Sequence, residues 1–275
     1  MKRILITGAH SFIGTHIETY LGRFADRYET ETLSMHGHTP EEYDFHGADA
    51  VVHVAAIVHQ KDIERLQPLY DAVNRDLTFT LAEKAKREGV KQFVFMSSIG
   101  VYGKIEGVID GETPLCPKTR YDRSKLEAEQ RIAPLADDSF AVTILRAPVV
   151  FGPGAKGNPA KLDRIAAHLP VCPDFENRRS MLAIETLCET VRALLDAPRS
   201  GIFIPQEEKP VSTSDLIARS MRAHGRKPGR TKLLNPAIRA VRACTRIGKK
   251  AFGDLVYRGP FERELSAIRR EEEER

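Results

Sequence analysis

The chain has 275 residues, a length that suits one α/β domain with a smaller lobe. Hydrophobic residues make up 41% and charged residues 29% of the chain, as in ordinary globular proteins, and the net charge of +4 indicates no nucleic-acid partner. The four cysteines are widely spaced, which predicts reduced thiols and no metal site. No signal peptide or membrane-spanning segment is visible, so we expect a cytoplasmic protein.

The first motif is a short apolar run, residues 3–7, that stops at Gly8 and leads into a helical pattern. A strand, a glycine turn and a helix start form an arrangement whose backbone amides can face a pyrophosphate. Glycine occupies the first and last positions of the usual pattern, whereas Ser11 takes the middle one, where its hydroxyl could donate to a phosphate. A tight turn with no ligand is the alternative. The predicted turn and helix start comprise Gly8, Ser11, Phe12, Ile13 and Gly14.

A second strand, near residues 29–33, should end in an acidic residue if the adenosine ribose of NAD is held there. The sequence continues instead with Ser34, Met35 and His36. This leaves NAD and NADP both open. The stretch 35–47 is too short for another helix and strand, so we expect the sheet to be abbreviated on this side.

Residues 49–56 form a nearly continuous apolar run that predicts a buried parallel strand. Its end, Ala55 and Ala56, is small enough for a cofactor to pass close by. A helix is predicted over 69–88, with Gly89 ending it. Two interpretations of Asn74 are open: it points toward the strand ends, or it is a surface or capping residue.

The next strand, 92–98, is polar at its carboxyl end, and this edge of an open α/β sheet is where ligands bind. Ser98 therefore has a candidate functional role. A loop over 101–117 leads to a helix over 121–135, on which Tyr121 and Lys125 lie one turn apart. An ammonium group beside a phenol favours the phenolate, which predicts a lowered pKa for Tyr121 and a proton-transfer role. A solvated surface pair is the alternative.

A further strand over 141–145 completes the strand–helix alternation, which predicts a doubly wound parallel sheet, Rossmann-like, with a smaller C-terminal lobe. We place a dinucleotide-binding domain at 1–155 and a substrate-binding lobe at 156–275. The lobe should contain a helix capped by Asn158, a strand over 178–184, a helix over 185–195, a strand over 201–204 and a helix over 214–224. A basic amphipathic segment, 236–252, is predicted to dock on its own lobe or on a second subunit, with weak membrane-surface contact as the alternative. The tail from residue 261 is predicted to be a solvated helix.

The ordered motifs of the chain resemble the extended short-chain dehydrogenase/reductase family, and within it the NAD-dependent epimerase/dehydratase branch. The resemblance covers the first two-thirds of the chain well and the remainder thinly. It rests on five segments, Thr7–Gly14, Val52–Ala56, Met96–Gly103, Tyr121–Lys125 and Leu145–Gly154.

The resemblance implies that Tyr121 is the catalytic acid/base, that Lys125 is its electrostatic partner, and that Ser98 hydrogen-bonds the reacting oxygen. It also implies that Asn158 and Arg179 hold the substrate diphosphate, for which the forked guanidinium is suited. The expected cofactor-binding residues are Gly8, Ser11, Phe12, Ile13, Gly14, Ala55, Ala56, Asn74, Tyr121, Lys125 and Pro148.

Dehydratases of the family follow the catalytic Ser/Thr with an Asp-Glu pair, whereas this chain has Ile99 and Gly100 there, which argues against dehydration. The resemblance therefore predicts NAD-dependent epimerisation of a nucleotide sugar, a UDP-hexose at C4, through a keto sugar. The alternatives are a net NAD(P)H-dependent reductase or dehydrogenase of a carbonyl compound and a non-catalytic dinucleotide sensor. The resemblance also suggests a homodimer formed through the helices over 69–88 and 121–135.

Overall fold

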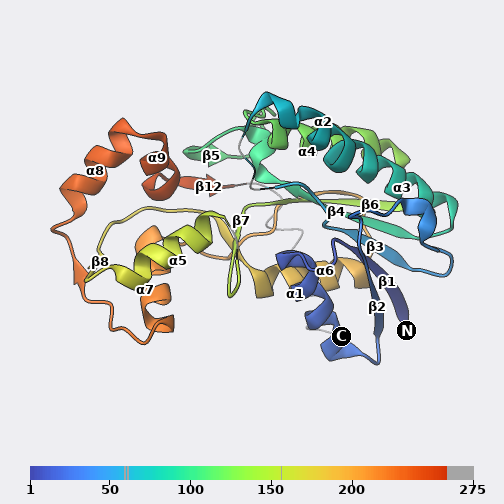
Figure 1. Ribbon diagram of the computed structural model, residues 1–275, viewed down its shortest axis with the longest axis horizontal. Helices are drawn as coiled ribbons and strands as arrows, with labels where there is room; N and C mark the ends of the chain where they lie inside the picture. Colours follow the sequence, from blue (N-terminus) through green and yellow to red (C-terminus); the bar gives the residue numbers. More distant parts are fainter. Residues whose placement is uncertain (59, 61, 156, 259–275) are drawn as a thin grey trace.

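The computed structural model describes residues 1–58, 60, 62–155 and 157–258, so the predicted tail helix lies outside the described residues. Its centre is a six-stranded parallel sheet with the order β10-β6-β4-β3-β1-β2 (Figure 1). The sheet strands are β1 (Lys2–Thr7), β2 (Tyr28–Leu33), β3 (Ala50–His53), β4 (Gln92–Ser98), β6 (Ala141–Ala147) and β10 (Gly201–Phe203). The central strands are buried along nearly their whole length, as strands covered on both faces must be. The prediction of a doubly wound, Rossmann-like sheet is confirmed.

Helices cover both faces of this sheet (Figure 1). One face packs against α1 (Phe12–Leu21) and α6 (Ile184–Asp196), around a core that includes Ile6, Ile17 and Leu187. The other face packs against α3 (Leu77–Arg87) and α4 (Arg120–Ile132). The helix predicted over 69–88 is present, but it is built from α2 (Gln67–Tyr70), a π-helical segment over Asp71–Asp76, and α3.

The strand order reverses beside β1, because β2 lies on one side of it and β3 on the other. In open α/β sheets, ligands bind in the crevice at the carboxyl ends of the strands where the order reverses. Between β2 and β3 the only helix is the single 3-10 turn Pro40–Glu42, so the sheet is abbreviated at this edge, as the short sequence predicted.

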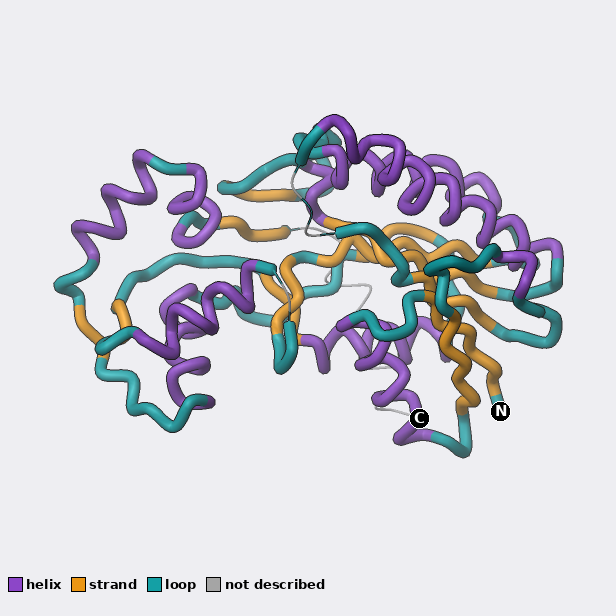
Figure 2. Tube along the Cα trace, viewed as in Figure 1, coloured by secondary structure: helices purple, strands orange, loops and turns teal. Residues whose placement is uncertain are grey.

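The second lobe is small and built on short elements (Figure 2). Its helices are α5 (Asn158–His168), α7 (Thr213–Ala223), α8 (Asn235–Cys244) and α9 (Arg246–Phe252). Three two-stranded parallel pairs accompany them: β7 (Val149–Phe151) with β9 (Met181–Ala183), β8 (Cys172–Pro173) with β11 (Arg230–Thr231), and β5 (Gly107–Ile109) with β12 (Leu255–Tyr257). A separate apolar cluster in this lobe contains Ala166, Cys172, Ile217, Ala218 and Met221, with Leu162 and Leu169 packed against it.

The chain returns to the main sheet after the boundary that we placed at residue 155. Strand β10 pairs with β6, and α6 packs against α1. Residues 184–203 therefore belong in space to the domain that contains the main sheet. The predicted elements over 185–195 and 201–204 are present, but they complete the sheet domain instead of the lobe. No helix in the described part of the chain is both long and apolar enough to span a bilayer.

A buried ion pair ties α4 to the sheet. Arg146 on β6 donates to both carboxylate oxygens of Glu129 on α4, at 2.7–3.2 Å, and both side chains are almost fully buried. The guanidinium also donates to the hydroxyl of Tyr102 at 2.7 Å, and the Ser97 hydroxyl donates to Glu129. Burying two charges is tolerable only when the partners satisfy each other in this way.

We predict that Arg146→Met destabilises the protein by about 3–5 kcal/mol, because it leaves the Glu129 carboxylate buried without its cation. The double variant Glu129→Leu/Arg146→Met should recover most of this loss. The free energy of unfolding, measured in urea, checks both expectations. Arg230→Gln, which breaks an exposed pair with Asp215, is the matched control and should cost less than about 1 kcal/mol. If Arg146→Met also lowered the free energy of unfolding by less than about 1 kcal/mol, the stabilising role of the Arg146–Glu129 pair would be contradicted.

Candidate active site

The glycine turn after β1 lies directly against the end of β3. Gly8 has φ +87°, a backbone conformation that favours glycine, and a Cβ there would lie 2.9 Å from the amide nitrogen of Ala55. The amides of Gly8 and Ala9 donate to the carbonyl of Leu33 at the end of β2. The turn therefore joins β1, β2 and β3 at the crevice where the strand order reverses.

Ser11 is the N-cap of α1, and its hydroxyl oxygen accepts from the amide of Gly14 at 2.9 Å. Its hydroxyl proton is not used by this contact. A Cβ on Gly14 would lie 2.8 Å from both the Gly8 carbonyl and the Ser11 hydroxyl oxygen, so the helix start packs tightly on the turn. Phe12 and Ile13 pack on the core beneath it. The amides of Phe12 and Ile13 have no hydrogen-bond partner among the described residues, so they can face an anionic ligand such as a pyrophosphate.

Asn74 holds the loop that follows β3. Its side-chain oxygen accepts from the Ile57 amide at 2.8 Å, and its nitrogen donates to the Ile57 carbonyl and to the Ser124 hydroxyl. Ser124 in turn donates to the carbonyl of Tyr121. Asn74 is fully buried in the π-helical segment, and both of its donor hydrogens are taken within the chain. Its predicted contact with a cofactor stays a prediction, and its observed role is to join Ile57, the residue after Ala56, to Ser124 on α4.

A buried polar relay, which the sequence did not reveal, lies behind this loop. The Thr78 hydroxyl donates to the Asn74 carbonyl, so it accepts the proton on Nε2 of His53 at 2.9 Å. Nδ1 of the same ring then accepts from the Thr7 hydroxyl at 2.6 Å. Burial lowers the pKa of His53 to about 3, with the nearby Lys125 as a second cause, so the ring is neutral. The relay connects the last residue of β1 with the helix that carries Asn74.

Ser98 and Tyr121 meet at the carboxyl end of β4. Ser98 is the last residue of this strand, and its hydroxyl oxygen accepts from the amide of Gly100 at 3.0 Å. Ser98 also lies near the Tyr121 phenol, and its hydroxyl lowers the pKa of that phenol. Tyr121 lies in the first turn of α4, half-buried, with its ring edge-on to Tyr70. The two side chains that the resemblance assigns to the reaction thus lie near each other, and their contact with a reacting oxygen stays a prediction.

The predicted fall in the Tyr121 pKa is wrong for the chain by itself. Burial of the phenol raises its pKa, and the negative charge of Asp122 raises it further, so these effects outweigh the Ser98 hydrogen bond. The ammonium does not compensate because it points elsewhere: Lys125 Nζ donates to the backbone carbonyl of Met96 at 2.8 Å. Tyr121 is therefore protonated at neutral pH and ready to act as an acid.

Lys125 is almost fully buried beneath the strand ends, with Nζ 4.6 Å from the centre of the Phe95 ring. Burial lowers its pKa to about 7, partly opposed by the charge of Glu129. The predicted one-turn spacing between Tyr121 and Lys125 is correct. However, a pKa of about 7 leaves part of the Lys125 amine neutral at neutral pH, and the amine donates to the Met96 carbonyl of β4. Its expected contact with a ribose stays a prediction.

Asp122 is a further carboxylate at the site that sequence reasoning missed. The Thr119 hydroxyl, which caps α4, donates to it at 2.6 Å, and a Cβ on Gly100 would overlap it. The glycine that replaces the acid of family dehydratases thus makes room for this carboxylate. Its position next to Tyr121 in the sequence, on a helix start that favours acids, was the available signal.

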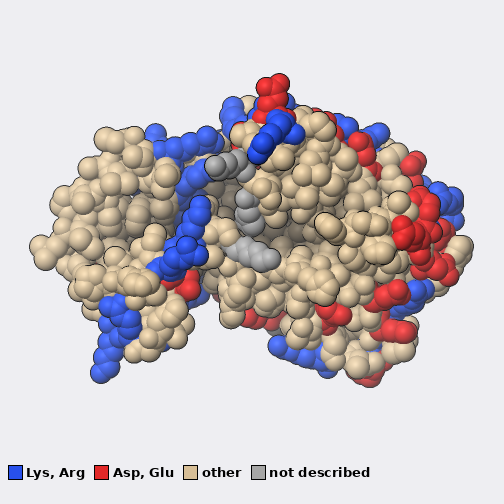
Figure 3. All heavy atoms as spheres, viewed as in Figure 1, with Lys and Arg blue, Asp and Glu red and all other residues tan. Residues whose placement is uncertain are grey.

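The predicted substrate residues lie in the second lobe. Asn158 is exposed and is the first residue of α5, while Gly157 is the N-cap, so the prediction that Asn158 caps this helix is wrong. Arg179 donates to the Gly253 carbonyl at 2.8 Å, and its burial lowers its pKa. Pro148 follows Ala147, whose register partner across the sheet is Ser98. Figure 3 shows a hollow between the two lobes, with lysine and arginine side chains gathered along its edge.

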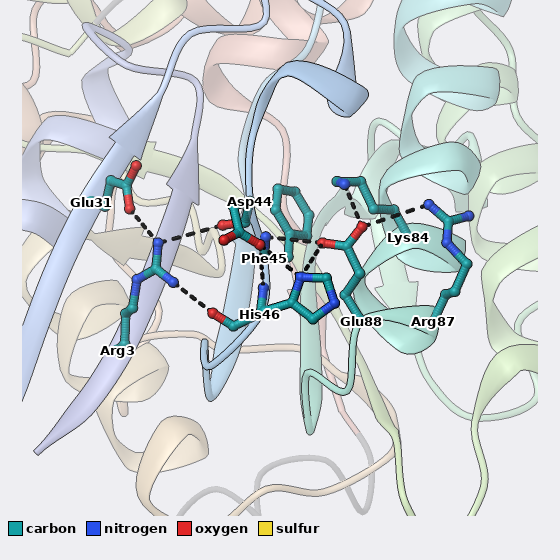
Figure 4. Close-up of polar contacts among 8 residues, drawn as sticks. All are labelled: Arg3, Glu31, Asp44, Phe45, His46, Lys84, Arg87 and Glu88. Carbon is teal, nitrogen blue, oxygen red and sulfur yellow. Dashed lines mark hydrogen bonds and ion pairs between the residues drawn. The ribbon is translucent and has the colours of Figure 1, made fainter.

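A cluster of Asp44, His46 and Glu88 beside the start of β1 brings three possible metal ligands together (Figure 4). Its acids are already used within the chain. Glu88 pairs with Lys84 and accepts from the Phe45 amide, while Asp44 accepts from the amide and ring of His46. Arg3 and Arg87 add positive charge around it. The cluster therefore links chain segments at this end of the sheet. We assign no metal site to it.

Comparison with known proteins points to one family. The model of the NAD dependent epimerase/dehydratase family matches residues 4–203. A UDP-glucose 4-epimerase of Vibrio cholerae is 33% identical to the chain over 244 residues, which are 78% of this chain and 74% of that protein.

Two solved structures are similar in fold. One, described as a UDP-glucuronic acid 4-epimerase from Bacillus cereus in complex with NAD, has a TM-score of 0.70 and 18% identity, covering 96% of this chain and 91% of the other. The second is a dTDP-4-dehydrorhamnose reductase from Bacillus anthracis in complex with NADP, with a TM-score of 0.73 and 15% identity, covering 98% of both chains. At these identities the likeness shows the fold alone.

We predict that the stability gained by Lys125→Met depends on pH. With a folded-state pKa of about 7 and an ordinary value of 10.5, the unfolded chain binds a proton that the folded protein lacks between these limits. The free energy of unfolding of the wild type should therefore rise with pH across this window, by about 1.4 kcal/mol per pH unit from this group. The variant lacks this slope, so its advantage over the wild type is greatest near pH 7 and shrinks toward pH 10.

Urea unfolding of both proteins at several pH values in this range measures the difference. Lys91→Met, at an exposed lysine, is the matched control and should run parallel to the wild type. Parallel curves for Lys125→Met as well would mean that the amine keeps its ordinary pKa in the folded protein.

Proposed function

This chain belongs to the NAD dependent epimerase/dehydratase family, and we propose that it is an NAD-dependent epimerase that inverts C4 of a nucleotide-linked hexose. The observation that carries the proposal is the meeting of Ser98 and Tyr121 at the carboxyl end of the sheet, beside the crevice at the glycine turn. A hydroxyl placed between these two groups can lose its proton there. The UDP-glucose 4-epimerase relationship supports a nucleotide sugar as the substrate.

The residues around the crevice fit a dinucleotide. Gly8 leaves backbone room that a Cβ would close, and the amides of Phe12 and Ile13 have no partner among the described residues. Ala55 and Ala56 present only small side chains. Bound NAD would supply the hydride acceptor for oxidation of the sugar carbon and the hydride donor for its reduction. Within the described residues, the end of β2 offers neither an acid nor an arginine, so NADP is also compatible with this site.

The chain's own residues handle the proton. In the forward step, Tyr121 first loses its own proton to solvent in the loaded enzyme and then takes the proton of the sugar hydroxyl, while Ser98 donates a hydrogen bond that holds the reacting oxygen. The carbon's hydride leaves in the same step, which gives a keto sugar. After the sugar turns over, Tyr121 returns the proton to the oxygen, and the carbon recovers its hydride on the opposite face. Each turnover therefore leaves both Tyr121 and the cofactor unchanged.

Substrate binding is assigned to the second lobe. Asn158 is exposed at the start of α5, and Arg179 contributes a guanidinium whose remaining donors suit a diphosphate. Family dehydratases have an acid and a base directly after the catalytic serine, whereas this chain has Ile99 and Gly100 at these two positions. Epimerisation needs neither the acid nor the base.

A second candidate is a net NAD(P)H-dependent reductase of a keto sugar. Burial and Asp122 keep Tyr121 protonated, and a protonated phenol is what reduction of a ketone requires. The similarity in fold to a reductase fits this alternative. Consumption of the cofactor separates the two functions.

Association into a homodimer through the helices predicted over 69–88 and 121–135 remains a prediction. The exposed sides of these helices carry a network in which Arg75 pairs with Asp71, Asp76 and Glu127, and Arg131 pairs with Asp76. A contact made there would join two charged surfaces, so we expect it to weaken as the salt concentration rises.

We predict that the purified protein interconverts UDP-glucose and UDP-galactose, or their N-acetylated forms, with no net change at the absorbance band of reduced nicotinamide. Product formation is measured by chromatography, and mass spectrometry of the native protein reports retained NAD. Tyr121→Phe should lower turnover at least about a thousandfold while the affinity for NAD stays nearly constant, because only the proton acceptor is removed.

Stoichiometric oxidation of NADPH with a keto sugar would establish the reductase instead. Full activity of Tyr121→Phe would reject the proton-transfer mechanism for either reaction. Binding of a dinucleotide without turnover of any sugar nucleotide would leave only the sensor function.

We further predict that Asp122→Asn shifts the acid limb of the turnover–pH profile toward lower pH. Asp122 raises the pKa of Tyr121, so removing its charge makes the phenolate available at lower pH. At a fixed pH below the limb, turnover should increase by up to about tenfold, the equivalent of one pKa unit. Asp76→Asn removes a carboxylate that does not act on Tyr121 and is the control. A limb that stays in place would show that another group governs it.

A further inference from the structure

Helix α8 exposes its apolar side chains to solvent, whereas an ordinary surface helix buries them against its own protein. None of its residues is buried, and the side chains that line its solvent face are apolar or small. The exposed residues Ala237, Ala240, Val241 and Cys244 follow helical spacing, at positions i, i+3, i+4 and i+7, and the exposed Leu233 lies in the turn that precedes the helix. An amphipathic helix usually buries such a stripe against its own protein.

The polar side of α8 faces inward. Arg242 donates to Glu106 at 3.0 Å and lies 3.5 Å from Asp254, which anchors the helix beside β5 and β12. The segment predicted as one basic helix is broken at Thr245, which caps α9. The two helices cross closely, because a Cβ on Gly248 would overlap the carbonyl of Val241. This crossing places Ile247, at the start of α9, near the end of the same apolar stripe.

The apolar side chains at the two ends of this surface are unusually open. Leu233 is 88% exposed and Ile247 is 80% exposed, more than any other large hydrophobic residue in the described part of the chain. We call the surface formed by Leu233, Ala237, Val241, Cys244 and Ile247 the α8 surface. Figure 3 shows few charged atoms over α8, at the end of the molecule that lies farthest from the sheet in this view.

The sequence around the α8 surface is strongly basic. Residues 216–253 contain no aspartate or glutamate, and with the whole chain at +4 the remaining residues carry a net charge of −7. The cations of this segment are Arg219, Arg222, Arg226, Lys227, Arg230, Lys232, Arg239, Arg242, Arg246, Lys249 and Lys250. Lys232, Arg246 and Lys250 are exposed at the ends of the surface and form no ion pair with any residue that the structure describes.

We propose that the α8 surface docks on an anionic lipid bilayer. Leu233, Val241 and Ile247 would enter the boundary between headgroups and acyl chains, while the flanking cations contact anionic headgroups. The charge of the segment complements such a surface. A protein partner fits less well, because protein interfaces centre on buried aromatic anchors, whereas the only aromatic residue over 230–252 is Phe252, which packs against Phe175.

Sedimentation of the full chain with vesicles tests the proposal. The protein should sediment with vesicles made of equal parts phosphatidylglycerol and phosphatidylcholine, and much less with phosphatidylcholine alone. The double variant Leu233→Glu/Ile247→Glu should bind the anionic vesicles at least about tenfold more weakly. Ile165→Glu, at an isoleucine of the same lobe that is 56% exposed, is the matched control and should bind as the wild type does.

The electrostatic part has its own variants. Arg246→Gln and Lys250→Gln should each weaken binding about fivefold at low salt, whereas the control Lys91→Gln should not. Circular dichroism and the unfolding midpoint establish that the variants are folded, since the substituted side chains are exposed.

Any of four results would overturn the proposal. Absence of binding to anionic vesicles, or equal binding by Leu233→Glu/Ile247→Glu, would remove the bilayer as the occupant. An oligomer in light scattering that the same variant dissociates would assign the α8 surface to a contact between copies of the chain. Vesicle binding that is found only after the chain is cut at Arg258 would assign the surface to residues 259–275. None of these results bears on the epimerase assay, so the two proposals fail separately.

Discussion

The site depends on how α4 is held against the carboxyl end of β4. Two contacts fix it: the hydrogen bond from Lys125 to the Met96 carbonyl, and the buried pair of Glu129 with Arg146. Lys125 and Glu129 are one turn apart on α4, so both project from the same face of the helix into the sheet. Tyr121, one turn before Lys125, is thereby carried to the strand end where Ser98 lies. A displacement of this helix by a fraction of a turn would separate the phenol from the serine.

Polar groups buried under the crevice act as a second support. The neutral His53 ring joins Thr7 to Thr78, and Asn74 joins the loop after β3 to Ser124 on α4. Each member has a partner, which is the condition under which a buried polar network rigidifies a structure instead of weakening it. Together these contacts connect β1, β3 and α4, the three elements that border the crevice. We interpret the π-helical turn at Asn74 as the local distortion that brings its amide to the loop.

Much of this arrangement could be predicted from the sequence, because the alternation of strands and helices and the glycine turn are local patterns. The place of Ser98 at a strand end and the spacing of Tyr121 and Lys125 were also visible. The direction of the Lys125 amine was not, since it depends on a carbonyl 29 residues away and on the burial of both groups. The return of β10 to the sheet was missed for a related reason: a three-residue strand has no signal that distinguishes one sheet from another. Asp122 was passed over because the effect of its charge on Tyr121 depends on where the two side chains lie in the folded chain.

The raised pKa of Tyr121 has a consequence for how the chemistry is divided between protein and ligand. The protein alone stabilises the neutral phenol, because burial and Asp122 outweigh the Ser98 hydrogen bond. The oxidised nicotinamide ring carries a positive charge, and a positive charge brought near a phenol favours its ionisation. Oxidation of the sugar would then begin only in the loaded enzyme, while the protonated phenol is already suited to the return step. The same polypeptide can therefore serve both the oxidation step and the reduction step of an epimerisation. The sign of the charge beside Tyr121 decides which of the two steps the site favours.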